Sequence, residues 1–108
     1  MQEIFKALAS YWHPKLERCG FVDKNNNIIE VENKHVNPTN HFAIDDVPAD
    51  AVAMWHTHPS GCCNLSTDDY HLFRRLPKLI HIIVGREDVA YYFIDTDEAV
   101  LRGDDNVS

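Results

Sequence analysis

The feature that most constrains this chain is a short apolar run that ends in two histidines. Residues 51–55 are all apolar, and they lead directly into His56-Thr57-His58. Such a run predicts a buried central strand over 51–56. Alternate side chains of a strand share one face, so His56 and His58 are expected to point the same way, about 6–7 Å apart along the chain. Two imidazoles in this arrangement can converge on a single ion.

A second group of polar residues follows after a loop at 59–65. Ser66 is a typical helix N-cap residue, and Asp69 stands three positions later, where a capping box places its acid. Zn²⁺ accepts imidazole nitrogen and carboxylate oxygen as ligands, and a catalytic zinc keeps one position open for water. Asp69 is therefore the candidate third ligand, with Asp68 as a rival. A helix cap without any metal is the simpler explanation of Ser66 and Asp69.

The remaining patterns predict a mixed sheet with helices on its faces, in the α/β (α+β) class. Apolar residues at helical spacing predict an amphipathic helix over 2–13, before Pro14. The other expected elements are a hairpin of strands 19–22 and 28–33 with a turn at 23–27, a loop at 34–41, an extended segment at 42–45, a helix at 67–76, a buried strand at 79–84 and its hairpin partner at 89–94. The acidic end from about residue 97 is expected to be an edge strand followed by a frayed tail.

Composition narrows the class of protein further. A chain of 108 residues is expected to form one domain, 1–108. The net charge of −7 argues against nucleic acid or an anionic membrane as the main partner, since both are polyanions. There is no apolar run long enough to span a bilayer and no signal-peptide pattern at the N-terminus. Three cysteines predict free thiols in a reducing compartment, so a cytoplasmic location is expected.

The histidines and the Ser66-x-x-Asp69 pair together resemble the motif of the JAMM (MPN-domain) zinc metalloproteases. That motif is a distant upstream glutamate, His-Ser/Thr-His, seven residues and Ser-x-x-Asp. The second part matches here at His56, Thr57, His58, Ser66 and Asp69. The likeness covers roughly residues 3–95. The chain resembles in particular the small bacterial and phage members, such as the N-terminal domain of siphophage tail assembly protein K. Two departures are Leu65, where family members often carry proline, and the unusual Cys62-Cys63 pair.

The resemblance implies a cytidine-deaminase-like architecture and a role for each matched residue. His56, His58 and Asp69 would hold Zn²⁺ with a water molecule. Glu17, two residues before Cys19-Gly20, would be the general base, and Ser66 would donate to the oxyanion. The reaction would be hydrolysis of a peptide or isopeptide bond. The substrate would be a protein or peptide, such as a phage tail protein or a ubiquitin-like conjugate, in the host cytoplasm or the virion tail.

Several alternatives stay open at this point. Glu30 and Glu32 are rival bases, although they fit better on a hairpin strand with one face exposed to solvent. Cys19 is expected to be a small core residue, and His71 and His81 are expected to be surface and strand residues. The second functional hypothesis is a catalytically silent scaffold of the same fold in a phage tail tip. A zinc deaminase is disfavoured because the chain lacks a Pro-Cys-x-x-Cys pair.

Overall fold

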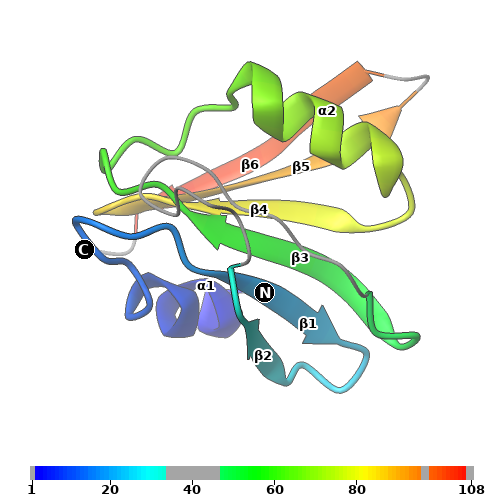
Figure 1. Cartoon of the computed structure of the whole chain (residues 1–108), viewed down its shortest axis with the longest axis horizontal. Coiled ribbons are helices and arrows are strands. Elements are labelled where there is room, and N and C mark those ends of the chain that lie inside the picture. Colours follow the sequence, from blue (N-terminus) through cyan, green and yellow to red (C-terminus); the bar gives the residue numbers. More distant parts are fainter. Residues whose placement is uncertain (1, 34–46, 96–97, 107–108) are drawn as a thin grey trace.

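A computed structural model describes residues 2–33, 47–95 and 98–106. The expected segments at 34–41 and 42–45 lie outside these ranges. The described chain forms a six-stranded mixed sheet in the order β2-β1-β3-β4-β5-β6, with one helix on each face (Figure 1). In sequence order the elements are α1 (Gln2–Ala9), β1 (Cys19–Asp23), β2 (Ile28–Val31), β3 (Ala51–Thr57), α2 (Thr67–Arg75), β4 (Ile80–Val84), β5 (Asp88–Asp95) and β6 (Glu98–Asn106). The mixed sheet and the order of helices and strands predicted from the sequence are confirmed.

The sheet is antiparallel except at its centre, where β3 and β4 run parallel. Parallel neighbours need a crossover between them, and α2 provides it. The chain therefore leaves the end of β3, passes through the loop after His58 and enters α2 beside the same end of the sheet. This connection places the N-terminus of α2 close to the two histidines.

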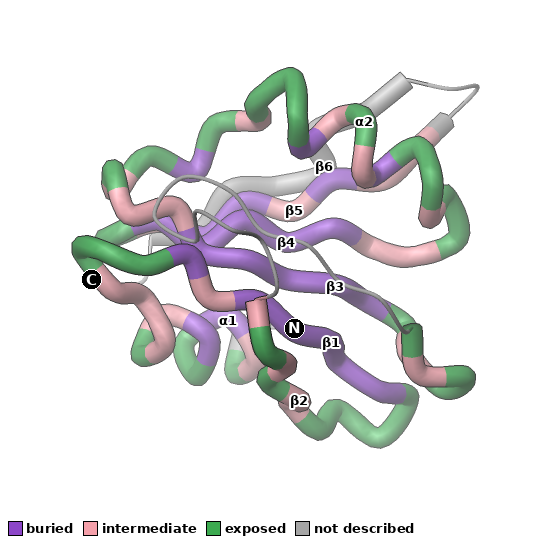
Figure 2. Tube along the Cα trace, viewed as in Figure 1, coloured by how far each residue is buried: buried purple, intermediate pink, exposed green. Residues whose placement is uncertain are grey.

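The core consists of two layers, one on each face of the sheet. In β3, Ala53 and Trp55 pack beneath α1, while Met54 faces α2, as the alternation of strand side chains requires. The central strands β1, β3 and β4 are buried along most of their length (Figure 2). The α1 layer contains Phe5, Leu8, Val22, Ala53, Trp55, Ile82, Val84 and Val89. The α2 layer contains Phe21, Met54, Cys63, Phe73, Ile83, Ala90 and Tyr92.

The first helix is shorter than the predicted 2–13: α1 ends at Ala9. The Ser10 hydroxyl donates to the carbonyl of Ala7 at 2.6 Å, a local bond that competes with helix continuation. The backbone N–H groups of Tyr11 and Trp12 then bond three residues back, which tightens the chain into turns. Trp12 lies three residues beyond the end of α1, and its indole contacts the backbone of His58.

At the other end of the chain, the predicted edge strand is present as β6, which pairs with β5. The acidic end from about residue 97 is thus strand up to Asn106 rather than a frayed tail from its start. The remaining strand boundaries differ from the predictions by one or two residues, as is usual for element ends. Within the described ranges, neither helix has the length and apolar character that crossing a bilayer would require.

His81 lies in β4 with its side chain fully buried, as its expected place in a strand implies. Its Nε2 lies 2.8 Å from the carbonyl oxygen of Leu76 at the C-terminus of α2, so Nε2 carries the proton. The ring stacks on Phe73 of α2 with 4.1 Å between ring centroids. Burial lowers the pKa of His81 to about 4. His81 thus joins α2 to the sheet as a neutral imidazole.

This neutral histidine predicts a loss of stability in acid. The folded pKa of His81 lies below its ordinary value of 6.5, so its contribution is complete above pH 6.5 and is lost as the pH falls toward 4. The displacement corresponds to up to about 3 kcal/mol. We expect His81→Gln, whose side-chain amide can still donate to Leu76, to lose less stability than wild type between pH 6.5 and 4. Urea unfolding at several pH values measures this, and equal pH dependence of the two proteins would contradict it.

Candidate metal site

The three predicted ligands come together at the end of β3. His56 is the penultimate residue of that strand, His58 follows the strand, and Asp69 lies in the first turn of α2. The two Nε2 atoms of the histidines are 2.9 Å apart. Asp69 Oδ1 lies 2.9 Å from Nε2 of His56, and its Oδ2 lies 3.0 Å from Nε2 of His58. Two imidazoles and one carboxylate thus direct their ligand atoms at a common point.

This arrangement could hold a metal ion. Zn²⁺ with bonds of about 2.0–2.1 Å to nitrogen and oxygen places tetrahedral ligand atoms roughly 3.3 Å apart. The observed separations of 2.9–3.0 Å need to open by only a few tenths of an ångström. Two neutral nitrogens and one carboxylate oxygen also suit a divalent cation of borderline softness. His56 and Asp69 are buried and His58 is half-buried, so the group opens outward on the side of His58.

The second ring nitrogen of His58 is held by the loop that follows the strand. Its Nδ1 lies 2.8 Å from the backbone carbonyl oxygen of Cys62. A carbonyl can only accept, so Nδ1 carries the proton and the lone pair of the neutral ring is on Nε2. Metal-binding histidines usually have such a partner, which fixes both the tautomer and the ring orientation. The loop therefore prepares Nε2 of His58 as a ligand atom.

Ser66 and Asp69 form the predicted capping box. The Asp69 N–H donates to the Ser66 hydroxyl oxygen at 3.1 Å, and the Ser66 N–H donates to Asp69 Oδ2 at 3.0 Å. Asp69 therefore serves the helix terminus and the histidine pair together. Its carboxylate is held from both sides before any ion is present, which lowers the ordering cost of binding one.

The charges of Asp69 and of the two imidazoles influence one another. Burial alone would raise the pKa of Asp69, but the two imidazoles outweigh it and hold that pKa well below its usual range. Burial lowers the pKa of His56, which stays neutral. Burial would also lower the pKa of His58, but its hydrogen bond to Asp69 and the charge of Asp69 raise it instead. The Asp69 carboxylate thus favours a positive charge beside it, and a bound cation would supply that charge in place of a proton on His58.

Glu17 lies in the segment that precedes β1, near enough to this group for its carboxyl to interact electrostatically with His58 and Asp69. Its side chain is buried, with 7% of its surface exposed. Its Oε2 atom is enclosed and has no hydrogen-bond partner among the residues that the structure describes. Burial raises the pKa of Glu17 to about 7; the charge of His58 lowers it, and the charge of Asp69 raises it. A carboxyl group with a pKa near neutrality suits a general base.

Thr57 attaches the Glu17 segment to the end of β3. Its backbone N–H donates to the carbonyl of Arg18 at 2.8 Å, and its hydroxyl accepts from the Arg18 N–H at 2.9 Å. Arg18 is the residue after Glu17, so these two bonds fix the carboxyl beside the histidines. This role of Thr57 was not predicted, because it depends on a contact with Arg18, 39 residues away in the sequence.

The other candidates of the sequence fall outside the metal group. Asp68 and His71 are exposed on α2, and Asp69 is the acid that reaches the histidines. Within the described ranges, no cysteine belongs to the group; Cys62 is exposed, while Cys19 and Cys63 are buried, and all three are free thiols. Burial raises the pKa of Cys19 to about 12, as expected for a core residue.

The rival base Glu30 is engaged elsewhere. Its carboxylate accepts from Nε and from the second terminal nitrogen of Arg18, both at 2.7 Å. The pair lies on one wall of a groove of about 430 Å³ that also includes Glu17 and Glu32. This groove is an approach to Glu17 from the edge of the sheet formed by β2.

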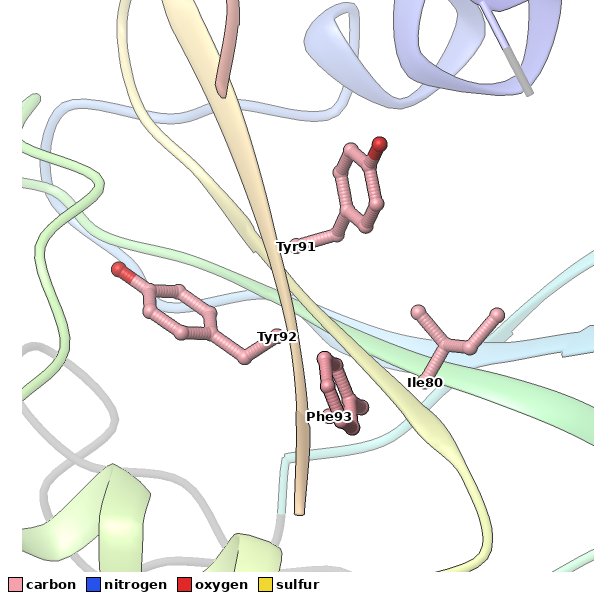
Figure 3. A pocket seen from close by; sticks show the side chains of 4 residues that line it. All are labelled: Ile80, Tyr91, Tyr92 and Phe93. Carbon is pink, nitrogen blue, oxygen red and sulfur yellow. The ribbon is translucent and has the colours of Figure 1, made fainter. Parts of the chain in front are cut away.

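A second pocket, of about 340 Å³, lies away from the histidines (Figure 3). Tyr91, Phe93 and Ile80 line one side of the sheet there, while Tyr92 points to the other side. Tyr91 and Ile80 pack against the α1 layer, on the face opposite the metal group. This pocket is apolar and contains none of the candidate residues.

Comparisons with known proteins add nothing to this geometry. Neither the scan against protein-family models nor the search of curated proteins finds a match to the chain. The functional assignment below therefore depends on the residues and the geometry alone.

Proposed function

We propose that the chain is a zinc-dependent hydrolase of the JAMM type, with an MPN-like, cytidine-deaminase-like architecture, that cleaves a peptide or isopeptide bond. The observation that carries this proposal is the convergence of His56, His58 and Asp69, with the buried carboxyl of Glu17 in electrostatic contact with His58 and Asp69. A site that only binds a metal ion, without catalysis, would need the three ligands and no nearby acid such as Glu17. A buried carboxyl group without a hydrogen-bond partner at Oε2 is costly to keep, and it is explained by acid–base work.

The roles of the residues follow from their chemistry. His56, His58 and Asp69 would hold the ion, which when bound supplies a Lewis acid that brings the pKa of water near neutrality. Glu17, as the carboxylate, would take the proton from the attacking water at one carboxyl oxygen. The same oxygen would then deliver the proton to the leaving amine. The Ser66 hydroxyl would donate to the oxyanion while its oxygen still accepts from the Asp69 N–H.

A direct test begins with the metal. We expect the purified wild-type chain to bind about one zinc ion, with a higher unfolding temperature in zinc than in chelator. At a free zinc concentration 100 times the Kd, the stabilisation would be about 2.7 kcal/mol. The loaded protein is then assayed with a fluorogenic peptide library and with ubiquitin joined through a lysine isopeptide bond.

The outcomes separate the two functional hypotheses. Zinc-dependent cleavage that stops in chelator supports the hydrolase. Stoichiometric zinc without cleavage of any peptide or isopeptide probe would favour the scaffold of the same fold. Failure to bind zinc would contradict the proposal at its first step.

A further inference from the structure

A contact between distant parts of the chain ends at the backbone of one metal ligand. The indole N–H of Trp12 donates to the carbonyl oxygen of His58 at 2.7 Å, between residues 46 positions apart in sequence. The same carbonyl accepts from the Gly61 N–H at 2.9 Å. The His58 N–H donates to the carbonyl of Val84 in β4 at 2.9 Å. Both polar backbone groups of His58 are therefore held.

Arg86, in the turn between β4 and β5, holds the other side of the indole. Its guanidinium carbon lies 5.2 Å from the centroid of the Trp12 ring, within the range of a cation–π contact. Its backbone N–H donates to the carbonyl of Gly61 at 3.0 Å. We refer to residues 58–63 as the metal loop. Arg86 thus contacts both the metal loop and the tryptophan that is bonded to it.

We propose that Trp12 is a positioning residue for the metal site, which fixes His58 through its carbonyl, and that Arg86 keeps the indole in place. The inference rests on the metal site of the proposed function. His58 lies one residue beyond the end of β3; its N–H still bonds to Val84 of β4, but its carbonyl is held by Trp12 and Gly61 rather than by a neighbouring strand. With its backbone held by Trp12, Gly61 and Val84 and its Nδ1 held by Cys62, the imidazole has little freedom left to lose when it binds an ion.

The position of Trp12 argues against a role in packing alone. The helix that precedes it has already ended at Ala9, so the indole is not needed to complete a helical face. Trp12 is only half-buried, and it packs at the margin of the α1 layer. Its N–H nevertheless makes the shorter of the two indole hydrogen bonds. The other tryptophan, Trp55, is fully buried and donates to the carbonyl of Phe21 at 3.2 Å, in β1 and away from the metal loop.

The two tryptophans of the chain therefore form a matched pair of variants. Trp12→Phe and Trp55→Phe each remove one indole N–H from one backbone carbonyl and keep an aromatic ring. Zinc affinity of the full chain is measured by competition with a chromogenic chelator, and unfolding temperature is measured on the metal-free protein. We expect Trp12→Phe to weaken zinc binding about tenfold, as the loss of a partner that orients a ligand does. Trp55→Phe should change the affinity less than twofold and lower the unfolding temperature more.

These opposite effects distinguish positioning of His58 from a general loss of stability, because Trp55→Phe would be the less stable of the two variants and would still bind zinc more tightly than Trp12→Phe. Zinc affinity of Trp12→Phe equal to that of wild type would overturn the inference while leaving the proposed metal site intact. So would losses of affinity in both variants that follow their losses of stability. Failure of wild type to bind zinc would instead refute the metal site itself.

Arg86→Ala provides a second variant that keeps the indole N–H. It removes the guanidinium beside the ring, while the backbone bond from residue 86 to Gly61 can remain. A loss of zinc affinity that is smaller than that of Trp12→Phe is expected, about two- to threefold. An unchanged affinity in Arg86→Ala would refute the part assigned to that side chain.

Discussion

Replacement of Glu17 by Gln is expected to abolish hydrolysis while zinc stays bound. The carboxyl interacts electrostatically with His58 and Asp69 but does not belong to the candidate metal group, so the substitution would remove the proposed proton acceptor and leave the three candidate ligands in place. Loss of general acid–base catalysis reduces rates by 10²–10⁴-fold. The measurement is the cleavage rate of the zinc-loaded protein, together with its zinc content.

The free energy of unfolding of the same variant controls for a folding defect. The folded pKa of Glu17 is raised from 4.5 to about 7, so its contribution is fully present below pH 4.5 and is lost as the pH rises through 7. The ionised, buried carboxylate then costs up to about 3 kcal/mol. We expect metal-free Glu17→Gln to gain stability relative to wild type between pH 5 and 8. A variant that loses both activity and stability at pH 8 would show a folding defect, and the catalytic role would then lack support.

Asp69→Ala is expected to lose zinc, whereas Asp68→Ala keeps it. The two acids are neighbours in the first turn of α2, so they interact similarly with the helix dipole. Asp69 contacts both imidazoles, and its removal also deletes the half of the capping box in which its side chain accepts from the Ser66 N–H. Since loss of an indirect partner alone weakens metal binding 10–100-fold, loss of this ligand should exceed 100-fold.

Zinc competition with a chelator and thermal unfolding of both variants measure this difference. Asp69→Asn gives a further comparison, because the amide oxygen can still accept from the Ser66 N–H but carries no charge. We expect it to retain more of the helix cap than Asp69→Ala while binding zinc poorly. Loss of zinc in Asp68→Ala with zinc retained in Asp69→Ala would mean that the ligand has been misassigned.

The grouping of the three candidate metal ligands could be predicted because its signal is local in the sequence. His56 and His58 share a strand face by simple alternation, and Ser66 and Asp69 are joined by the short-range geometry of a helix N-terminus. The convergence of the two histidines with Asp69 and the capping box at Ser66 are confirmed in the structure. The parallel pairing of β3 with β4 was not predicted and is seen only in the structure.

Other parts of the site depend on contacts that leave no pattern in the sequence. The carbonyl groups of His58 and Cys62 carry no side-chain identity, so their bonds to Trp12 and to the imidazole could not be foreseen. The end of α1 at Ala9 was missed for a similar reason. The helical spacing of apolar residues continues to Trp12, but the Trp12 ring contacts His58, far away in the sequence, and does not extend the helix. The burial of Glu17 likewise depends on how β1 and β3 pair.

The spacing of the site along the chain also has a consequence for how it is assembled. The three candidate ligands fall between residues 56 and 69, so an ion bound there would close only a short loop, and loop-closure entropy grows with length. Glu17 and Trp12 reach the same place only after much longer loops close, through pairing of β1 with β3. In the proposed hydrolase, capture of the ion and completion of the catalytic site would therefore be separable events. A chain whose N-terminal segment has detached would retain the three candidate ligands but not the proposed proton acceptor.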